Sequence, residues 1–479
     1  MGNQHKIKWI GLLLGPILFL LIQLTSDHLA LSERATHVLG IAAWMVIWWV
    51  LEVIPIFVTA LLPIVLFPTF KVFSLAESTA PYASPIIFLF MGGFMLALAM
   101  EKHQLHKRIA LSLIKLTGTS ANTILLGFML ATALLSMWIS NTATAVMMLP
   151  IGLSVVKLLE KSMEETKAFQ RFKLVLFLGI AYSANIGGMA TIIGTPPNVV
   201  LLGYVKSLLS TDISFIEWFS FGLPVVLLLL LLTYFLLVKL LFPNNLGELK
   251  EAATYIDQEI RKLGGWSREE KCVATIFSLT ALAWILKNQI NQMLGDAYLN
   301  DTVTAMAGGI ATFIVPINKK GKKLMSWEMM KELPWGILLL FGGGMCLAKA
   351  MEAAGFVDLI AKQITELNNV HWSIILLVLI ALGLFLTEIM SNVALTTIAI
   401  PMVIGIAQGL QVEPLYFIIP VAMASSCAFM MPISTPPNAV VYASGYIQMS
   451  KMIKAGLLLN LLSVMVLFLL AYFILPIIF

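Results

Sequence analysis

The segment LLSMWISNTATAVMMLP, residues 134–150, interrupts an apolar run with the polar triplet Ser140-Asn141-Thr142. A second segment, FLTEIMSNVALTTIAIP at residues 385–401, carries Ser391-Asn392-Val393 at the matching place, 251 residues later. Polar interruptions at corresponding positions of two apolar halves are the sequence feature that best locates a central binding site in a transporter. These two segments therefore predict where a central binding site lies in this chain.

Each half also contains a double proline, in Thr195-Pro196-Pro197-Asn198 and in Thr435-Pro436-Pro437-Asn438. Two prolines remove two backbone donors, and a proline disfavours helix at the residue before it. We therefore predict that the apolar runs 174–205 and 416–444 are broken helices. A single break of this kind would favour a packing kink, because proline is common in membrane helices. The matched pair favours a binding site.

The composition excludes a soluble globular protein. Of the 479 residues 59% are hydrophobic and 11% are charged, and the mean hydropathy is +0.94. These values predict an all-α polytopic integral membrane protein. Lys6 and Lys8 precede the apolar run 9–24, which has no small-residue cleavage pattern. We expect a retained first helix, with the amino terminus in the cytoplasm.

The two halves are a duplication. Residues 90–101 (FMGGFMLALAME) align with residues 341–352 (FGGGMCLAKAME) at the same offset as the polar triplets. An odd number of crossings separates corresponding elements, so the second copy is expected to be inverted relative to the first. The predicted divisions are an amino-terminal helix and external loop (1–37), the first repeat (38–242), a charged cytoplasmic linker (243–271) and the second repeat (272–479).

The distribution of lysine and arginine supports eleven crossings plus two re-entrant hairpins, at 117–156 and 373–408. With this topology 24 of the 30 basic residues lie on the cytoplasmic side. The arms of the first hairpin hold about 17 and 14 apolar residues, fewer than the ~20 that a span needs. We expect a multi-pass protein of the cell membrane whose carboxyl terminus is external. The predicted crossings are 9–24, 38–51, 54–68, 84–100, 174–205, 222–242, 272–292, 302–317, 334–350, 416–444 and 455–478.

The hairpin tips have the chemistry of an anion site. The helix that leaves a tip begins with unpaired N–H donors and the positive end of its dipole, and serine and asparagine cap such a start. Two starts that converge from opposite sides would bind the two carboxylates of a small dianion. Binding through N–H groups and hydroxyls avoids placing a permanent cation within the membrane.

The proline breaks have the chemistry of a cation site. A broken helix frees carbonyl oxygens, here at Ile193-Gly194 and at Ile433-Ser434. These are hard oxygen donors that suit a small cation, and Thr195 and Thr435 add hydroxyl groups. We therefore expect anion and cation sites to lie side by side.

The paired Ser-Asn tips and paired Thr-Pro-Pro breaks resemble those of the divalent anion:sodium symporter family, which includes sodium–dicarboxylate and sodium–citrate carriers and related dicarboxylate exchangers. The resemblance covers essentially the whole chain. It implies a secondary transporter of small dicarboxylates such as succinate, malate, fumarate or 2-oxoglutarate. The mechanism would be sodium symport or anion exchange. It also implies a homodimer in which a transport domain moves as an elevator against a fixed scaffold.

The resemblance further implies site residues. Substrate contacts would come from the two tips, with the Thr-Pro pairs closing the pocket: Ser140, Asn141, Thr142, Ser391, Asn392, Thr195, Pro196, Thr435 and Pro436. One cation site would consist of Ser136, Ser140, Asn141 and Gly194. Its mirror would consist of Thr387, Met390, Asn392 and Ser434.

Two residues depart from the duplicated pattern. Val393 stands where the first copy has Thr142, so one side of the pocket lacks a hydroxyl group. Glu388 lies three residues before Ser391, and Met137 occupies its equivalent position. An acid at this depth is either a coupling group for a proton or cation, or a structural group that hydrogen-bonds backbone at the hairpin. The sequence leaves both open.

Other functions fit less well. Dipole-lined tips would also accept citrate, sulfate or another oxyanion, and an anion channel is a second alternative. An intramembrane enzyme would need a nucleophile–base pair or metal ligands at depth, which the apolar segments lack. The glycines of Gly92-Gly93 and Gly342-Gly343-Gly344 are not followed by the Lys-Ser/Thr of a phosphate-binding loop, and the three cysteines have no paired spacing. We therefore expect no cofactor, no disulfide and no metal beyond sodium. Nothing suggests nucleic-acid binding.

Overall fold

The computed structural model describes residues 2–25, 31–296, 298–317, 321–356, 359, 361–362 and 370–479, with side chains from residue 10 onward. Within these ranges the structure is helical, and β-structure is limited to two isolated bridges. The described part of the chain is therefore all-α, as the sequence predicts.

The elements follow one another as α1 (Gly2–Leu24), α3 (Glu33–Val50), α4 (Ile56–Thr59), α5 (Leu62–Thr69), α6 (Leu75–Thr79), η1 (Ala80–Ala83), α7 (Pro85–Lys102), α8 (Leu105–Thr117), α9 (Ala121–Ser136), α10 (Asn141–Ser162), α11 (Lys167–Gly188), α12 (Pro196–Leu208), α13 (Phe215–Tyr234), η2 (Phe235–Leu241), α14 (Lys250–Leu263), α15 (Arg268–Ile285), α16 (Lys287–Leu294), α17 (Asp301–Ile314), η3 (Trp327–Glu332), α18 (Trp335–Ala353), α20 (Trp372–Leu386), α21 (Asn392–Gly409), α22 (Leu415–Ala424), α23 (Pro436–Tyr442), α24 (Met449–Phe473) and α25 (Leu475–Ile478).

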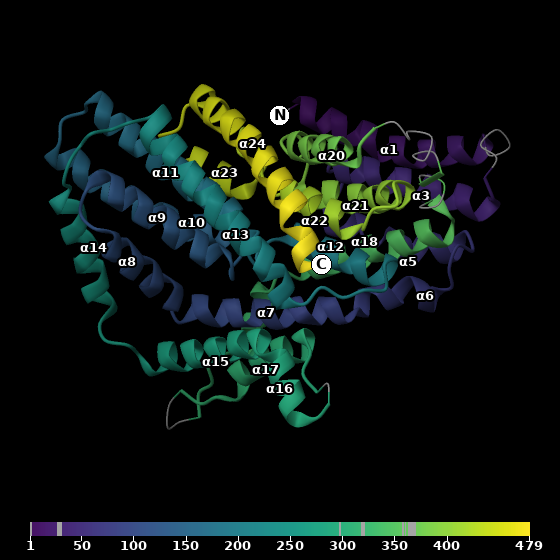
Figure 1. Cartoon of the computed structure of the whole chain (residues 1–479), viewed down its shortest axis with the longest axis horizontal. Coiled ribbons are helices and arrows are strands. Elements are labelled where there is room, and N and C mark those ends of the chain that lie inside the picture. The colour runs from purple at the N-terminus through teal and green to yellow at the C-terminus, as the bar shows by residue number, and fades with distance from the viewer. Residues whose placement is uncertain are drawn as a thin grey trace.

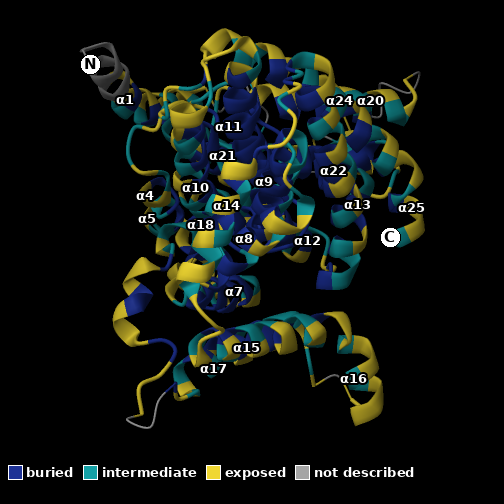
Figure 2. Cartoon of the chain, turned by 90° about the vertical axis from the view of Figure 1, so that its left-hand side faces the viewer, coloured by how far each residue is buried: buried dark blue, intermediate teal, exposed yellow. Residues whose placement is uncertain are grey.

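The helices form a large body with a smaller layer beneath it. In Figures 1 and 2, α15, α16 and α17 lie below the main body, and α7 joins the two because it packs along α17. α1 and α3 pack against each other at the opposite corner of the view in Figure 1. Both polar tips and both proline breaks lie in the main body.

Elements from the two halves cross within the main body. α10 of the first half packs against α23 of the second, and α12 of the first half packs against α21 of the second. α11 is enclosed by its neighbours, and its residues 172–188 are all buried. This crossing brings segments of the two halves that are far apart in sequence to one region of the fold.

Several helices have the length and composition of membrane spans. Within the described ranges, six stretches qualify by themselves: Leu75–Lys102, Asn141–Ser162, Phe215–Leu241, Trp335–Ala353, Asn392–Gly409 and Met449–Ile478. The pair α15 and α16 qualifies as a seventh, with a bend of 75° between its parts. The predicted span 54–68 is divided between the short helices α4 and α5.

The second arm of the first hairpin is longer than the sequence predicted. The apolar run ends at residue 156, but α10 continues to Ser162 through Lys157, Glu160 and Lys161. Lysine and glutamate are good helix formers, so charge ends the apolar run without ending the helix. α10 and α21 therefore have the length of a span, whereas their partners α9 and α20 have only 16 and 15 residues.

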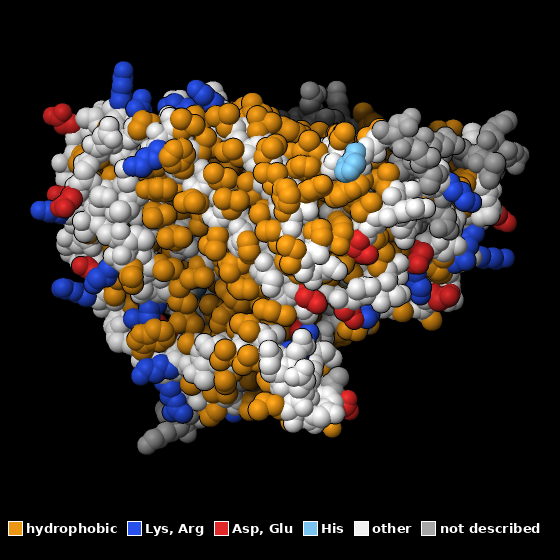
Figure 3. Space-filling view, viewed as in Figure 1, with side chains coloured by type: hydrophobic (Ala, Val, Ile, Leu, Met, Phe, Trp, Pro, Cys, Tyr) orange, Lys and Arg blue, Asp and Glu red, His pale blue; other side chains and the backbone are white. Residues whose placement is uncertain are grey.

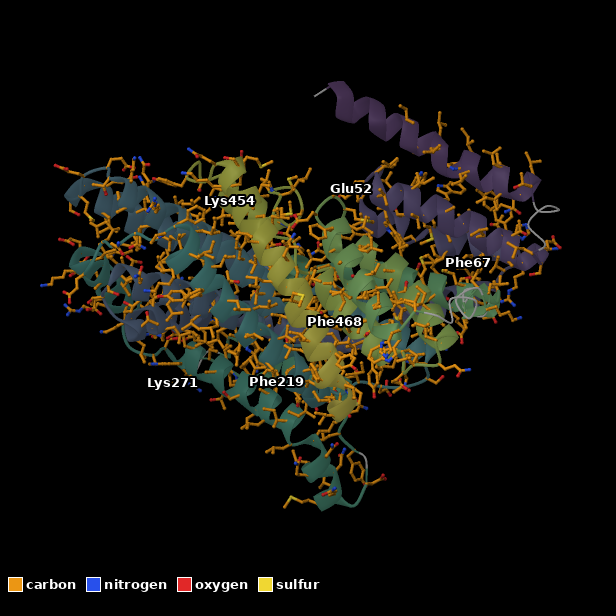
Figure 4. All side chains as sticks on the ribbon, turned by 45° about the horizontal axis from the view of Figure 1, so that its top comes forward. Glu52, Phe67, Phe219, Lys271, Lys454 and Phe468 are labelled. Atoms are coloured by element: carbon orange, nitrogen blue, oxygen red, sulfur yellow. The ribbon has the colours of Figure 1, made fainter. Side chains whose placement is uncertain are left out.

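The outer surface has the apolar character that lipid requires. Hydrophobic side chains cover the middle of the face shown in Figure 3, over α13 and α24, and charged side chains gather toward its left and right ends. Figure 4 shows the same division along α24, with Lys454 near the start of the helix and Phe468 farther along it. Phe219 lies on the neighbouring α13. A bilayer would cover this apolar band.

The predicted linker contains the amphipathic helix α14, which ion pairs attach to α8. Lys107 bonds Glu259 at 3.2 Å, and Lys115 bonds Asp257 at 2.7 Å. Glu259 also accepts a hydrogen bond from Lys262. The hydrogen bonds from Lys262 and then Lys107 hold the pKa of the Glu259 carboxyl below its usual range. The linker therefore lies against the helix that leads into the first hairpin.

Candidate functional site

The first tip consists of residues 137–140, between α9 and α10. Ser140 caps α10, because its hydroxyl accepts a hydrogen bond from the Ala143 N–H at 3.2 Å. The side chains of Ser140 and Thr142 are exposed, and Asn141 is half-buried. The first turn of α10 therefore presents N–H groups and polar side chains together, which is the arrangement that binds an anion.

Next to this tip, residues 189–195 form the unwound segment between α11 and α12. The Asn198 amide donates to the Thr191 carbonyl at 2.8 Å and to the Gly188 carbonyl at 3.3 Å. The Thr191 hydroxyl donates to the carbonyl of Met137 in the tip. The segment is thus held in a compact form by its own side chains and is attached directly to the hairpin.

A hydroxyl and two carbonyl oxygens surround the Asn141 amide where this segment meets the tip. The Ser136 hydroxyl donates to the Ala184 carbonyl at 2.7 Å. With its NH₂ group turned toward them, the Asn141 amide donates to that carbonyl at 3.2 Å, to the Gly194 carbonyl at 3.3 Å and to the Ser136 hydroxyl at 2.7 Å. Rotation of the amide would bring a fourth oxygen to this place, an arrangement that a bound cation would stabilise.

The second tip, residues 387–391, repeats this arrangement. The Thr387 hydroxyl donates to Asn392 Oδ1 and to the Ser425 carbonyl, both at 2.7 Å. Thr387 and Asn392 lie 251 residues after Ser136 and Asn141, so the duplication seen in the sequence extends to the hydrogen bonds.

The second tip also differs from the first. Among the described residues, no N–H group caps α21 through the Ser391 side chain. Ser391, Asn392 and Val393 are all half-buried, and Val393 packs against hydrophobic residues, as does Met390. Val393 therefore packs against apolar neighbours, and it leaves the second tip without the hydroxyl group that Thr142 gives the first tip.

The second unwound segment, residues 425–435, is bound by the carboxylate of Glu388. This carboxylate accepts hydrogen bonds from the N–H groups of Phe429, Met430 and Met431, at 2.7, 2.9 and 3.1 Å. The Asn460 amide on α24 donates to the same carboxylate at 2.8 Å. Glu388 is 4% exposed. Its bonds go to the unwound segment of the broken helix rather than to the hairpin's own backbone.

The remaining predicted residues of this half lie at the end of the segment. The Ser434 hydroxyl donates to the Met431 carbonyl, and it accepts from the Asn438 amide at 3.3 Å. Thr435 is buried and its hydroxyl accepts from the Asn438 N–H, whereas Pro436 is exposed. In the first half Thr195 is also buried, and Pro196 is half-buried. Both threonines are therefore buried, but Thr435 caps its helix through its hydroxyl and Thr195 does not.

Asn185 on α11 joins the two halves. Its amide donates to Thr435 Oγ1 at 3.1 Å, and to the Ala428 carbonyl and Asn438 Oδ1 at 3.3 Å each. A second link is the hydroxyl of Tyr204 on α12, which donates to the Thr397 carbonyl on α21 at 2.7 Å. The tips and breaks of both halves thus belong to one continuous polar region within an apolar core.

A cavity of about 300 Å³ lies elsewhere, where the end of α12 meets α18 and η1. The predicted site residues do not line it. Its lining residues are Ala80, Pro81, Ser84, Gly203, Lys206, Ser207, Met345, Lys349 and Glu352.

Comparison with known proteins agrees with this arrangement. A family model described as the sodium:sulfate symporter transmembrane region matches residues 6–478. The chain belongs to this family. It is accordingly a membrane transporter and not an enzyme.

Relatives within the sodium:sulfate symporter family are similar over almost the whole chain. The sodium-dependent dicarboxylate transporter SdcS of Staphylococcus saprophyticus is 39% identical over 473 residues, which cover 98% of this chain and 91% of that protein. The SdcS of Staphylococcus aureus strain MRSA252 is 41% identical over 476 residues, with the same coverage.

Two solved structures share the fold. The YdaH transporter of Alcanivorax borkumensis aligns with a TM-score of 0.61 and 15% identity, covering 85% of this chain and 89% of that one. MtrF of Neisseria gonorrhoeae aligns with a TM-score of 0.57 and 12% identity, covering 83% of each chain. At these identities the likeness concerns the fold alone.

Two residues of this transporter's polar region, Asn185 and Asn460, are not among the predicted site residues. Each is an isolated asparagine in a strongly apolar helix, and both are almost fully buried. A lone polar side chain within a membrane segment is itself a functional signal, because it needs a partner there. This signal was present in the sequence, but it did not identify the partner.

Proposed function

We propose that this transporter carries small dicarboxylates, among them succinate, malate, fumarate and 2-oxoglutarate, and that sodium drives their uptake. The convergence of the Ser136 hydroxyl and the Ala184 and Gly194 carbonyls on the Asn141 amide is the observation that carries the proposal. The hydroxyl and the two carbonyls are neutral oxygen donors of the kind that bind sodium, and rotation of the amide would add its oxygen to the set. The relatives named sodium-dependent dicarboxylate transporters support both the ion and the substrate.

The anion would bind across the two tips. The first turns of α10 and α21 offer N–H groups, and each tip adds side-chain donors. In this proposal the substrate carboxylates contact Ser140, Asn141 and Thr142 on one side and Ser391 and Asn392 on the other. Thr195-Pro196 and Thr435-Pro436 close the pocket. The prolines suit that position because they have no N–H group of their own to satisfy.

Sodium would bind beside the anion in each half. The first set is Ser136, Ser140, Asn141 and Gly194, and the second is Thr387, Met390, Asn392 and Ser434. The bond between Thr387 and Asn392 supports the second set, because it repeats the bond between Ser136 and Asn141. Cations at these positions would offset the charge of the dianion in a medium of low dielectric constant.

The proposed architecture follows the repeat. Two inverted repeats, 38–242 and 272–479, would provide eleven crossings and two re-entrant hairpins, with the amino terminus in the cytoplasm and the carboxyl terminus outside. The hairpins and broken helices would form a transport domain that moves as an elevator in each subunit of a homodimer. The crossing of α10 with α23 and of α12 with α21 supports a single moving unit, because it interlocks the two halves.

Uptake into liposomes tests the substrate and the coupling. Purified protein is reconstituted, and radiolabelled succinate uptake is measured with and without an inward sodium gradient, into empty vesicles and into vesicles preloaded with 2-oxoglutarate. We expect sodium-driven uptake into empty vesicles. Uptake that needs preloading and ignores sodium would establish exchange instead. Transport of citrate or sulfate in place of succinate would refute the substrate, and ohmic currents far above carrier turnover would establish a channel.

Substitution at the tips tests the site. Asn141→Ala and Asn392→Ala should each abolish succinate uptake while the protein remains folded. Thr144→Val is the control, since Thr144 lies on α10 near the first tip and its buried hydroxyl has no hydrogen-bond partner among the described residues. Uptake at the wild-type rate by both asparagine variants would refute the pocket.

A further inference from the structure

The two unwound segments differ in length. The first comprises residues 189–195 and the second residues 425–435. When Thr195 is matched with Thr435, the extra residues are 425–428, which correspond to the last turn of α11 in the first half. The second helix therefore ends about one turn earlier than the first, and more of its backbone N–H groups need partners outside a helix.

The first segment satisfies part of its backbone locally. The Ala190 N–H donates to the Gly187 carbonyl at 3.0 Å, and the Gly194 N–H donates to the Thr191 carbonyl at 3.4 Å. Met137 stands at the tip position that matches Glu388, and it provides a carbonyl rather than a carboxylate. The first half thus holds its break without an acid.

The second segment also has local bonds, at the N–H groups of Ser426, Cys427 and Ser434, and it adds the carboxylate of Glu388. Three consecutive N–H groups, those of residues 429–431, point at this one carboxylate. Hydrogen bonds to an ionised acceptor are roughly twice as strong as neutral ones. Thr387, the residue before, holds the other end of the segment through the Ser425 carbonyl. Adjacent side chains of the tip therefore fix both ends of the stretch 425–431.

Asn460 completes the arrangement from a different helix. Its amide nitrogen donates to Glu388 Oε1 at 2.8 Å, and the residue is fully buried on α24. α24 also packs against α20 and α22, which flank the tip and the unwound segment. Asn460 thereby connects α24 to the carboxylate that holds the break, and it fixes the position of that carboxylate.

We propose that Glu388 and Asn460 are positioning residues for the second cation site, a role that rests on the proposed function. By binding residues 429–431, the pair keeps the unwound segment in the shape that places Ser434 and the Ser425 end beside Thr387 and Asn392. Neither side chain needs to touch sodium or substrate. Loss of the carboxylate should therefore lower the apparent affinity for sodium more than the apparent affinity for dicarboxylate.

Hydrogen exchange tests the backbone part of this proposal without reference to transport. In Glu388→Gln the side chain keeps one acceptor oxygen and replaces the other with a donor, which cannot accept from an N–H group. We expect amides in the peptide 425–435 to exchange at least about tenfold faster, the effect of losing one or more charged hydrogen bonds. The peptide 189–195 should not change. Unchanged exchange in 425–435 of the folded variant overturns the proposal.

Transport tests the positioning part. In reconstituted Glu388→Gln we expect the sodium concentration for half-maximal succinate uptake to rise about tenfold or more, with a smaller change in the KM for succinate at saturating sodium. Glu388→Asp should recover part of the loss. Glu413→Gln is the control, because Glu413 is an exposed acid just before α22. A fall in maximal rate with unchanged sodium dependence overturns the positioning role.

Asn460→Leu keeps the experiment decisive where Glu388→Gln fails to fold. It removes one of the four donors to the carboxylate and leaves the three backbone bonds, so both effects should appear at smaller size. If Asn460→Leu shows wild-type hydrogen exchange in 425–435 and wild-type sodium dependence, the proposed joint role of Glu388 and Asn460 is refuted. If the wild-type protein transports no dicarboxylate, the proposed function fails, and the exchange measurement still decides whether Glu388 holds the segment.

Discussion

Asn185→Leu should weaken both the stability and the transport of the protein, because Asn185 joins the two halves. Its amide nitrogen faces three acceptors at 3.1–3.3 Å, but it carries two hydrogens, so it makes at most two full hydrogen bonds. Each neutral bond contributes about 0.5–1.5 kcal/mol, and a buried acceptor left unpaired costs about 1–3 kcal/mol. The Ala428 carbonyl keeps the Asn438 amide as a donor at 2.9 Å. We therefore expect a loss of about 2–4 kcal/mol.

The unfolding free energy of the variant is measured by titrating detergent-solubilised protein with a denaturing detergent. Succinate uptake is measured in liposomes at equal protein content, and its initial rate should fall at least about tenfold, since small displacements of binding groups have large effects on rate. Ser183→Ala is the control: Ser183 lies two residues away on α11, is fully buried, and its hydroxyl has no partner among the described residues. If Asn185→Leu matches this control in both assays, Asn185 does not hold the halves together.

Three further predictions concern separate parts of the structure. Thr142→Val removes an exposed hydroxyl from the first tip and should raise the KM for succinate by about tenfold or more, the value of a hydrogen bond to a charged group; an unchanged KM would remove Thr142 from the pocket. Arg108→Met leaves the carboxylate of Glu270 buried without its partner at 2.7 Å, so the unfolding free energy should fall by about 3–5 kcal/mol, and a loss below 1 kcal/mol would contradict this reasoning. Gly194→Ala places a Cβ atom against the Gly188 carbonyl oxygen, closer than van der Waals contact allows; sodium-driven uptake should be lost, and normal sodium dependence would show that the segment tolerates displacement.

Sequence reasoning was most effective where one local feature dictates the backbone. Two consecutive prolines have no N–H group, and both helices are interrupted directly before them, at Pro196 and Pro436. The start of α10 was equally accessible, since Ser140 is a typical capping residue and does cap the helix. α10 runs past the apolar segment to Ser162, because lysine and glutamate extend a helix well and a change from apolar to charged residues does not end it.

The sequence by itself determined that this is a duplicated membrane protein with a polar tip and a proline break in each half. Periodicity, composition and repeated motifs are properties of the chain and need no partner. The tertiary structure decided which of the lone polar residues meet: Asn185 with Thr435, and Glu388 with Asn460 and the backbone of 429–431. These pairs join residues 72 to 250 positions apart or join a side chain to backbone, so the packing of helices, rather than any local pattern, sets them. For this reason the sequence showed that Glu388 breaks the symmetry, and the fold showed what it holds.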